Sequence, residues 1–169
     1  MNIEQYISKI PDFPKKGILF YDLAPLLASA EAWQYTVDKI CEIVASLKPD
    51  LLAGIESRGF LISSAIATRM KLGSILIRKQ GKTPGEVISY SYKLEYGKDT
   101  LEINKSVIEE GKKILILDDV LATGGTINAS AELLKKANCT AIGAICVLEL
   151  GSLKGRDRIN IPSYSLITF

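Results

Sequence analysis

The chain alternates between short apolar runs and longer segments in which apolar residues recur at helical spacing. Helical spacing covers three segments: 30–47, 61–70 and 128–137. Continuous apolar runs, typical of strands buried on both faces, cover four more: 51–54, 74–77, 114–117 and 140–150. A terminal strand over 164–169 follows a short charged turn. This order predicts a three-layer α/β domain with a mostly parallel central sheet.

Two stretches interrupt this alternation. At the start, apolar residues at 3, 6, 7 and 10 predict a short amphipathic helix that Pro11 ends. Residues 11–22 contain prolines and a glycine, which predicts an irregular arm that either covers the core or forms part of a ligand pocket. Residues 79–104 combine a polar loop with a predicted hairpin of 87–94 and 101–103. This segment is either a mobile lid over a ligand site or a plain surface hairpin.

Bulk properties narrow the class of protein. A length of 169 residues predicts one domain over 1–169, and 47% hydrophobic with 24% charged residues is ordinary for a soluble globular protein. A formal charge of +2 without a basic run gives no reason to expect nucleic acid. The start lacks signal-peptide character and no apolar run reaches the ~20 residues of a membrane span. We therefore expect a cytoplasmic protein without a membrane partner.

The side-chain inventory removes several mechanisms. Because the chain has no histidine, Ser-His-Asp and Cys-His catalysis and HExxH zinc sites are excluded. Cys41, Cys139 and Cys146 lack metal-ligand spacing, so we expect reduced thiols. Any catalysis must use carboxylates, lysine, arginine, backbone amides or a divalent metal held by oxygen.

The segment ILILDDVLATGGT, residues 114–126, contains the most specific chemistry. Asp118 and Asp119 follow the apolar run, where a parallel strand would end at the carboxyl edge of its sheet. These carboxylates suit the hydroxyl groups of a sugar, a magnesium ion or a structural network. TGGT then offers backbone amides and hydroxyls at a helix start, which suits a phosphate monoester. A P-loop is excluded because GxxxxGK[ST] is missing, and a phosphoryl-accepting receiver would give TGGT no role. The segment predicts a sugar-phosphate site.

A second strand–turn–helix unit has the sequence IESRGF, residues 55–60. Its turn can supply backbone amides, a hydroxyl group and a guanidinium to an anion. Because ligands of parallel sheets bind outside the carboxyl ends of the strands, we expect this turn to face the same site as residues 118–126.

ILILDDVLATGGT resembles the phosphoribosyl-pyrophosphate motif of the type I phosphoribosyltransferases. Further segments are similar, in order and spacing, to those of family members that act on adenine: PDFPKKGILFYD, GIESRGF, IRKQGKTPG, LEYGKDTLEI and LELGSLKGR. The resemblance extends from about Ile10 to the C-terminus. It implies the family's fold, with an N-terminal hood over 1–25 and a mobile loop and hairpin over 79–104. It also implies a purine-salvage glycosyltransferase that transfers 5-phosphoribose from phosphoribosyl pyrophosphate to N9 of adenine, giving AMP and pyrophosphate.

The resemblance assigns residues to three subsites. The phosphoribose subsite comprises Asp118, Asp119, Ala122, Thr123, Gly124, Gly125 and Thr126. The pyrophosphate subsite, with a strained peptide expected at 56–57, comprises Glu56, Ser57, Arg58, Arg78, Lys79 and Lys82. The adenine subsite comprises Leu19, Phe20, Tyr21 and Glu95.

Within these sets the resemblance makes Arg58 and Glu95 catalytic. Arg58 neutralises the leaving group, Glu95 relays a proton for the purine, and Tyr96 helps to close the lid. Tyr21 departs from the family pattern, because many members have a basic residue there and tyrosine supplies no fixed positive charge.

The same resemblance implies Mg²⁺, held mainly by the substrate with Asp118 and Asp119 as candidate side-chain ligands, and a homodimer. Two alternatives stay open. One is a phosphoribosyltransferase for hypoxanthine, guanine or xanthine, although the LEYG segment and the hood favour adenine. The other is a non-catalytic sensor of phosphoribosyl pyrophosphate. The loop with Glu95 favours catalysis, and only about ten residues precede the PDFPKKGILFYD segment, too few for a helix-turn-helix unit.

Overall fold

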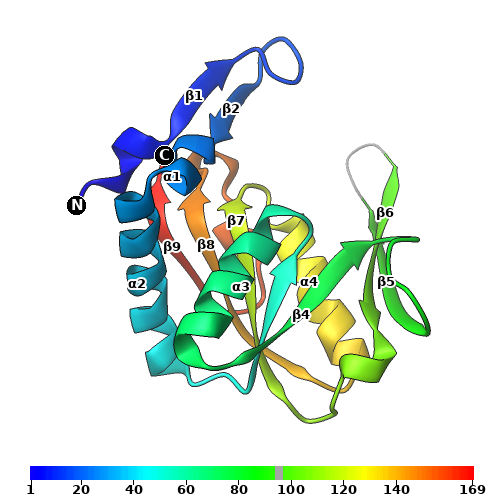
Figure 1. Ribbon diagram of the computed structural model, residues 1–169. Coiled ribbons are helices and arrows are strands. Elements are labelled where there is room, and N and C mark those ends of the chain that lie inside the picture. Colours follow the sequence, from blue (N-terminus) through cyan, green and yellow to red (C-terminus); the bar gives the residue numbers. More distant parts are fainter. Residues whose placement is uncertain (94–96) are drawn as a thin grey trace.

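A seven-stranded, mostly parallel sheet forms the centre of the protein in a computed structural model that describes residues 1–93 and 97–169 (Figure 1). The strand order is β5-β6-β4-β3-β7-β8-β9; the two pairs that β6 forms, with β4 and with β5, are antiparallel, and the other pairs are parallel. A separate antiparallel pair, β1 and β2, forms a hairpin near the N-terminus. The sequence prediction of a three-layer α/β domain with a mostly parallel sheet is confirmed.

The strands are β1 Ser8–Pro11, β2 Leu19–Asp22, β3 Leu51–Ile55, β4 Gly73–Lys79, β5 Val87–Lys93, β6 Lys98–Asn104, β7 Lys113–Leu121, β8 Thr140–Glu149 and β9 Ser163–Thr168. The α-helices are α1 Ala24–Ala28, α2 Ala30–Leu47, α3 Arg58–Met70 and α4 Gly125–Lys136. Short 3₁₀ turns cover Ile3–Tyr6, Lys105–Val107, Gly151–Leu153 and Arg156–Arg158. Among the described helices, none combines the length and apolar character needed to cross a membrane.

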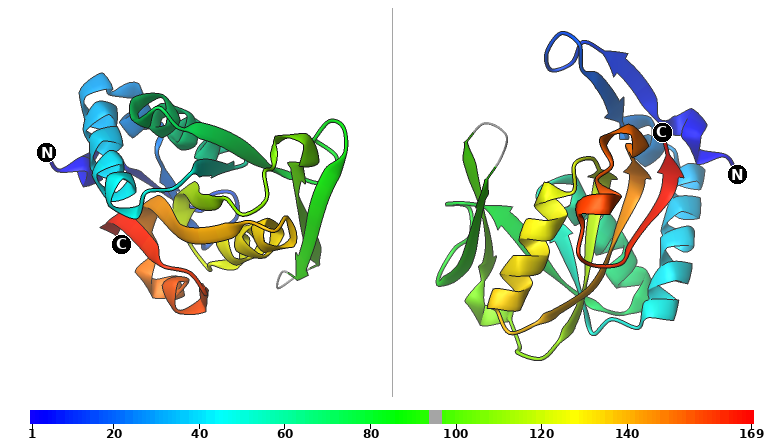
Figure 2. Two further views of the ribbon diagram at one scale, coloured as in Figure 1. Left: turned by 90° about the horizontal axis from the view of Figure 1, so that it is seen from below. Right: turned by 180° about the vertical axis from the view of Figure 1, so that it is seen from behind.

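The two faces of the sheet bury separate apolar cores. In β7, Leu115 and Leu117 pack toward α2 and α3, whereas Ile114 and Ile116 pack toward α4. All four are fully buried, as expected for a central strand covered on both faces. Figure 2 shows this layering, with α2 and α3 on one face and α4 on the other. The apolar run that stood out in the sequence is therefore the middle of the domain.

The N-terminal segment differs from its prediction. A helix over residues 3–10 is wrong, because only Ile3–Tyr6 forms a 3₁₀ turn and Ser8–Pro11 is strand β1. Ile3 and Ile7 are buried against the core, and one turn already brings both inward. The remaining residues gain more backbone hydrogen bonds by pairing with β2, so the arm over 11–22 is irregular only in its first half.

Three element boundaries also differ. Strand β7 runs to Leu121, so Asp118 and Asp119 lie within it rather than beyond its end. The longer β8 extends the parallel ladder, pairing Asp118 with Cys146 and Val120 with Leu148. Helices α3 and α4 begin at Arg58 and Gly125, earlier than predicted, so both turns lead directly into a helix N-terminus.

Helix α2 matches its predicted span and offers a test of local stability. Ser29 caps its N-terminus, with Oγ accepting a hydrogen bond from the Ala32 amide at 3.3 Å. Because the substitution leaves that amide without its partner, Ser29→Ala is expected to lower the free energy of unfolding by about 1 kcal/mol. Urea unfolding measures this. Ser46→Ala, at an exposed position of the same helix, is the control. Equal effects of both variants would contradict the capping role.

Candidate active site

A cleft of about 520 Å³ lies at the carboxyl edge of the sheet, where β3, β4 and β7 end side by side. The antiparallel pair β5 and β6 borders it. The cleft is lined by Ile55, Glu56, Ser57, Arg58, Lys79, Tyr92, Asp99, Leu101, Asp118, Asp119 and Thr126. The two strand–turn–helix units of the sequence therefore face one site.

The acidic pair forms one wall of this cleft. Asp119 is buried, and its Oδ2 lies 2.5 Å from Arg58 Nε without accepting a well-directed hydrogen bond. Asp118 Oδ1 accepts a hydrogen bond from the Asp119 amide at 2.9 Å. Burial, and then the charge of Asp119, raise the pKa of Asp118 well above its ordinary value. A buried carboxylate oxygen without a hydrogen bond is suited to accept one from the hydroxyl group of a ligand.

A second hollow, of about 70 Å³, adjoins the acidic pair. Residues 122–126 curl around it, and Gly124 has φ +82°, the left-handed conformation that favours glycine. Helix α4 begins at the next residue, so its free amides and the positive end of its dipole face the hollow. The hollow has the size and polarity of a phosphate cradle.

The segment after β8 supports this cradle from behind. A methyl group at Gly155 would collide with the Ala122 carbonyl, and one at Gly124 would collide with the Gly155 carbonyl. Arg156 fixes the segment by pairing with the buried Glu149, and this pair lowers the pKa of Glu149. Asn128 of α4 donates a hydrogen bond to the Arg158 carbonyl. The LELGSLKGR motif thus holds the cradle in shape, a role that sequence reasoning did not assign.

The opposite wall is the turn between β3 and α3. The peptide bond between Glu56 and Ser57, where the resemblance placed an unusual peptide, is cis. Arg58 opens α3, and its guanidinium carbon lies 5.4 Å from the Phe20 ring centroid, which brings the β1–β2 hairpin to the cleft. This wall presents a guanidinium and a helix N-terminus, a combination that binds anions.

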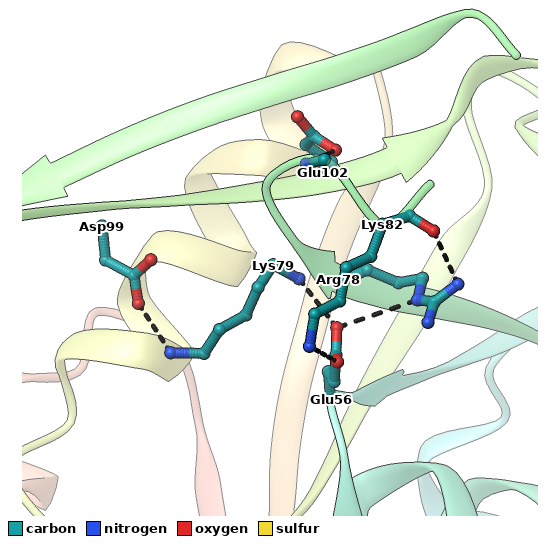
Figure 3. Close-up of polar contacts among 7 residues, drawn as sticks. Glu56, Arg78, Lys79, Lys82, Asp99 and Glu102 are labelled. Atoms are coloured by element: carbon teal, nitrogen blue, oxygen red, sulfur yellow. Dashed lines mark hydrogen bonds and ion pairs between the residues drawn. The ribbon is translucent and has the colours of Figure 1, made fainter. Parts of the chain in front are cut away.

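Cations around this wall are held by carboxylates (Figure 3). Glu56 accepts hydrogen bonds from Lys82 Nζ at 2.6 Å and from the Lys79 amide at 3.0 Å, and Arg78 Nε lies 3.7 Å from it. The hydrogen bond from Lys82 is the main reason that the pKa of Glu56 is lowered. Glu102 accepts from the Gly81 amide at 3.0 Å. The carboxylate of Glu56 therefore faces cations, and only its backbone is free to face an anion.

The structure brings together most, but not all, of the assigned residues. Of the adenine set, Phe20 reaches the cleft through Arg58, whereas Leu19 is 45% exposed and Tyr21 stacks on Phe169 at 4.8 Å. None of Leu19, Phe20 and Tyr21 lines the cleft itself, and Phe20 is linked to it only through the Arg58 guanidinium. Lys9, the cross-strand partner of Tyr21, lies over the Phe169 ring. Glu95 and Tyr96 lie outside the described residues.

Sequence reasoning missed Tyr92 and Asp99, which line the cleft from β5 and β6. Both lie within the segment predicted as a hairpin, and they face each other in its register. Only the pairing of that hairpin with β4 points them at the site, and the sequence contains no direct signal for it.

Known proteins share this fold. The family described as "Phosphoribosyl transferase domain" matches residues 29–168. The chain belongs to this family, and its fold is that of the type I phosphoribosyltransferases.

Within the family, similar proteins share one name. The chain is 48% identical to adenine phosphoribosyltransferase of Rhodospirillum rubrum, over 100% of this chain and 99% of that protein. It is 49% identical to the enzyme of that name from Rhodospirillum centenum, with the same coverage. The crystal structure of adenine phosphoribosyltransferase from Thermoanaerobacter pseudethanolicus superposes with a TM-score of 0.95 at 44% identity, over 99% of this chain and 98% of that one.

The close contact between Gly155 and the Ala122 carbonyl can be tested by measuring the free energy of unfolding of a variant. Gly155→Ala forces a methyl group against the Ala122 backbone and is expected to lower the free energy of unfolding by about 1–3 kcal/mol. Gly125→Ala is the control, because its methyl group has only Thr123 Oγ1, at 3.8 Å, nearby and it strengthens the helix start. Chemical denaturation distinguishes the two. A Gly155→Ala protein as stable as Gly125→Ala would show that the close packing is not required.

The raised pKa of Asp118 predicts that ionisation of this carboxyl group lowers the free energy of unfolding as pH rises. Between the unfolded pKa of about 4 and the higher folded pKa, the folded state binds more protons, so stability falls as pH rises. An asparagine side chain at this position does not titrate. Asp118→Asn should therefore gain stability relative to the parent over a pH range that begins at about 4 and extends upward toward the raised folded pKa, in metal-free buffer. Urea unfolding across this range measures the difference, with the exposed Asp157→Asn as control. A difference that stays constant would contradict the prediction.

Proposed function

We propose that this protein is a purine-salvage enzyme that transfers 5-phosphoribose from phosphoribosyl pyrophosphate to N9 of adenine, giving AMP and pyrophosphate. One observation supports this most strongly: a phosphate cradle, a buried acidic pair and a cation-bearing turn line adjoining hollows at one sheet edge. Their order matches the order of groups along the substrate. The full-length similarity to adenine phosphoribosyltransferases supports adenine as the base. A related yeast enzyme, 36% identical with a TM-score of 0.90, has been solved in complex with adenine.

In this proposal each wall binds one part of the substrate. The amides and hydroxyls of 122–126 hold the 5′-phosphate, and the carboxylates of Asp118 and Asp119 accept hydrogen bonds from the ribose hydroxyls. Arg58 bridges the two ends of the site, because it touches Asp119 on one side and lies at the anion-binding turn on the other. Ser57, Arg78, Lys79 and Lys82 complete the pyrophosphate side.

The reaction separates charge along this axis. The bond between ribose C1 and the pyrophosphate oxygen breaks, and its electron pair leaves with pyrophosphate. Adenine N9 forms the new bond to C1, and the N9 proton is lost to a base. Arg58 and the α3 N-terminus are oriented before reaction toward the negative charge that develops on the leaving group. The acidic pair faces the positive charge that develops on the sugar. Glu95 remains the proposed proton acceptor on the strength of the family resemblance.

Magnesium is part of the proposal. Among the described residues no cluster of three candidate ligands exists, so a site made of side chains alone is not available. The acidic pair fits a shared site, because Mg²⁺ binds through one or two carboxylates plus substrate phosphates and both carboxylates line the cleft. When bound, the ion would offset charge on the leaving pyrophosphate.

A homodimer and a cytoplasmic location belong to the same proposal. The β1–β2 hairpin exposes Phe13, Ile18 and Leu19, an apolar edge suited to a second copy of the chain. The three cysteines are free thiols, which is in keeping with a reducing compartment.

The proposed substrate is tested by assaying several bases with phosphoribosyl pyrophosphate and Mg²⁺. We expect kcat/KM for adenine to exceed that for hypoxanthine and guanine by about a hundredfold or more, because a site built for one pattern of donors and acceptors leaves groups unpaired with another. Liquid chromatography of the nucleotide products measures this. Comparable rates with hypoxanthine would reject specificity for adenine, and binding of phosphoribosyl pyrophosphate without turnover would indicate a sensor.

The role of Arg58 is tested by Arg58→Gln, which keeps much of the side-chain volume but removes the charge. Loss of one preorganised charge at the leaving group is expected to lower kcat by about 100-fold or more. Arg69→Gln is the matched control, since Arg69 is on the same helix and pairs with Asp38 away from the cleft. Steady-state assays with adenine compare the two. If Arg58→Gln keeps parental kcat, the leaving-group role is wrong.

A further inference from the structure

A carboxylate stands where an anionic substrate is proposed to bind. Asp99 lines the cleft from β6, and its Oδ2 accepts a hydrogen bond from Lys79 Nζ at 2.9 Å (Figure 3). Lys79, at the end of β4, belongs to the proposed pyrophosphate subsite. The nearest charge to its ammonium is therefore an anion of the protein itself.

Asp99 is fixed, whereas Lys79 is not. Asp99 Oδ1 accepts from the Thr100 amide at 2.9 Å, and Oδ2 also accepts from the Tyr92 hydroxyl at 3.3 Å. Its side chain is 21% exposed, compared with 55% for Lys79. The hydrogen bond between the two lowers the pKa of Asp99 and raises that of Lys79, so both are charged at neutral pH. The carboxylate is held by its hairpin while the ammonium swings on a four-carbon stem.

Glu56 plays a different part, although it also pairs with a cation of this region. It binds the Lys79 backbone amide as well as Lys82, so its removal would disturb the loop after β4. The side chain of Asp99, in contrast, accepts a hydrogen bond from Lys79 Nζ and not from the Lys79 backbone. Asparagine at 99 keeps one oxygen that can accept from the Thr100 amide, and its NH₂ group can donate to the Tyr92 hydroxyl oxygen, so the substitution chiefly removes the charge.

We propose that Asp99 is a positioning residue that holds Lys79 in the empty site and competes with pyrophosphate for its ammonium. The anion binds by taking Lys79 from Asp99, and Asp99 recaptures Lys79 when pyrophosphate leaves. Asp99 thus weakens binding at the pyrophosphate subsite and favours product release. This inference rests on the proposed function, because it requires that pyrophosphate occupy the cleft.

The test measures binding of inorganic pyrophosphate by calorimetry, with KM for phosphoribosyl pyrophosphate and kcat alongside. Asp99→Asn is expected to lower the Kd of pyrophosphate and this KM by about fivefold, the upper range for a partly exposed ion pair. It should not raise kcat, because product release slows. Asp99→Glu, which keeps the charge, should return Kd toward the parental value. Asp38→Asn breaks a pair of similar length, 2.8 Å, with Arg69 and is the matched control.

A double-mutant cycle shows whether Asp99 acts through Lys79. In a Lys79→Met background, Asp99→Asn should change the Kd by less than about twofold, because no ammonium is left to release. Weaker or unchanged binding in Asp99→Asn alone, or equal tightening with and without Lys79, would overturn this inference. Failure of the parental protein to convert adenine to AMP would instead overturn the proposed function.

Discussion

The contact between Arg58 and Asp119 joins the two halves of the site. Arg58 is the first residue of α3 and Asp119 lies near the end of β7, so their 2.5 Å ion pair connects the β3–α3 turn to the β7–α4 unit. Gly59 makes this approach possible, since a methyl group there would lie 2.6 Å from the Leu117 carbonyl oxygen. Helix α3 therefore begins directly against β7. The distance between the cation-bearing turn and the acidic pair is set by backbone packing.

Three cations in and beside the cleft each pair with a carboxylate of the protein. Arg58 faces Asp119, Lys82 faces Glu56 and Lys79 faces Asp99. Such pairing lets a partly buried site present several cations without strong mutual repulsion. Under the proposed function, an anionic substrate therefore binds by exchanging partners with these cations rather than by filling empty positive space. The acidic pair itself bears a cost, because burial and mutual repulsion disfavour two ionised carboxylates there.

The sequence could predict the parts of the fold that depend on local pattern. The apolar run 114–117 and the stripe of 30–47 determine the central strand and the longest helix, and both are confirmed. The N-terminal hairpin was not predictable from apolar spacing, because Ile3 and Ile7 satisfy one helical turn while pairing with β2 determines the conformation of residues 8–11. The extension of β7 through Asp118 depends on β8, a non-local partner.

The same limit applies to the site. Residues 56–58, 118–119 and 122–126 could be proposed from the sequence because each motif carries its chemistry within a few positions, and in the fold they line two adjoining hollows. Asp99 and Tyr92 were not found, because they reach the cleft only through the register of β5 on β6 and of β6 on β4. Tyr21 was assigned to the base, yet it stacks on the C-terminal Phe169, a contact between the two ends of the chain.

The most direct measurement is a crystal structure with AMP and pyrophosphate bound together. We predict that the 5′-phosphate lies within 122–126, that the ribose hydroxyls contact Asp118 and Asp119, and that pyrophosphate lies between Arg58 and Lys79 with Lys79 released from Asp99. A ribose bound away from the acidic pair, or pyrophosphate outside the turn at 56–58, would contradict this arrangement of the site.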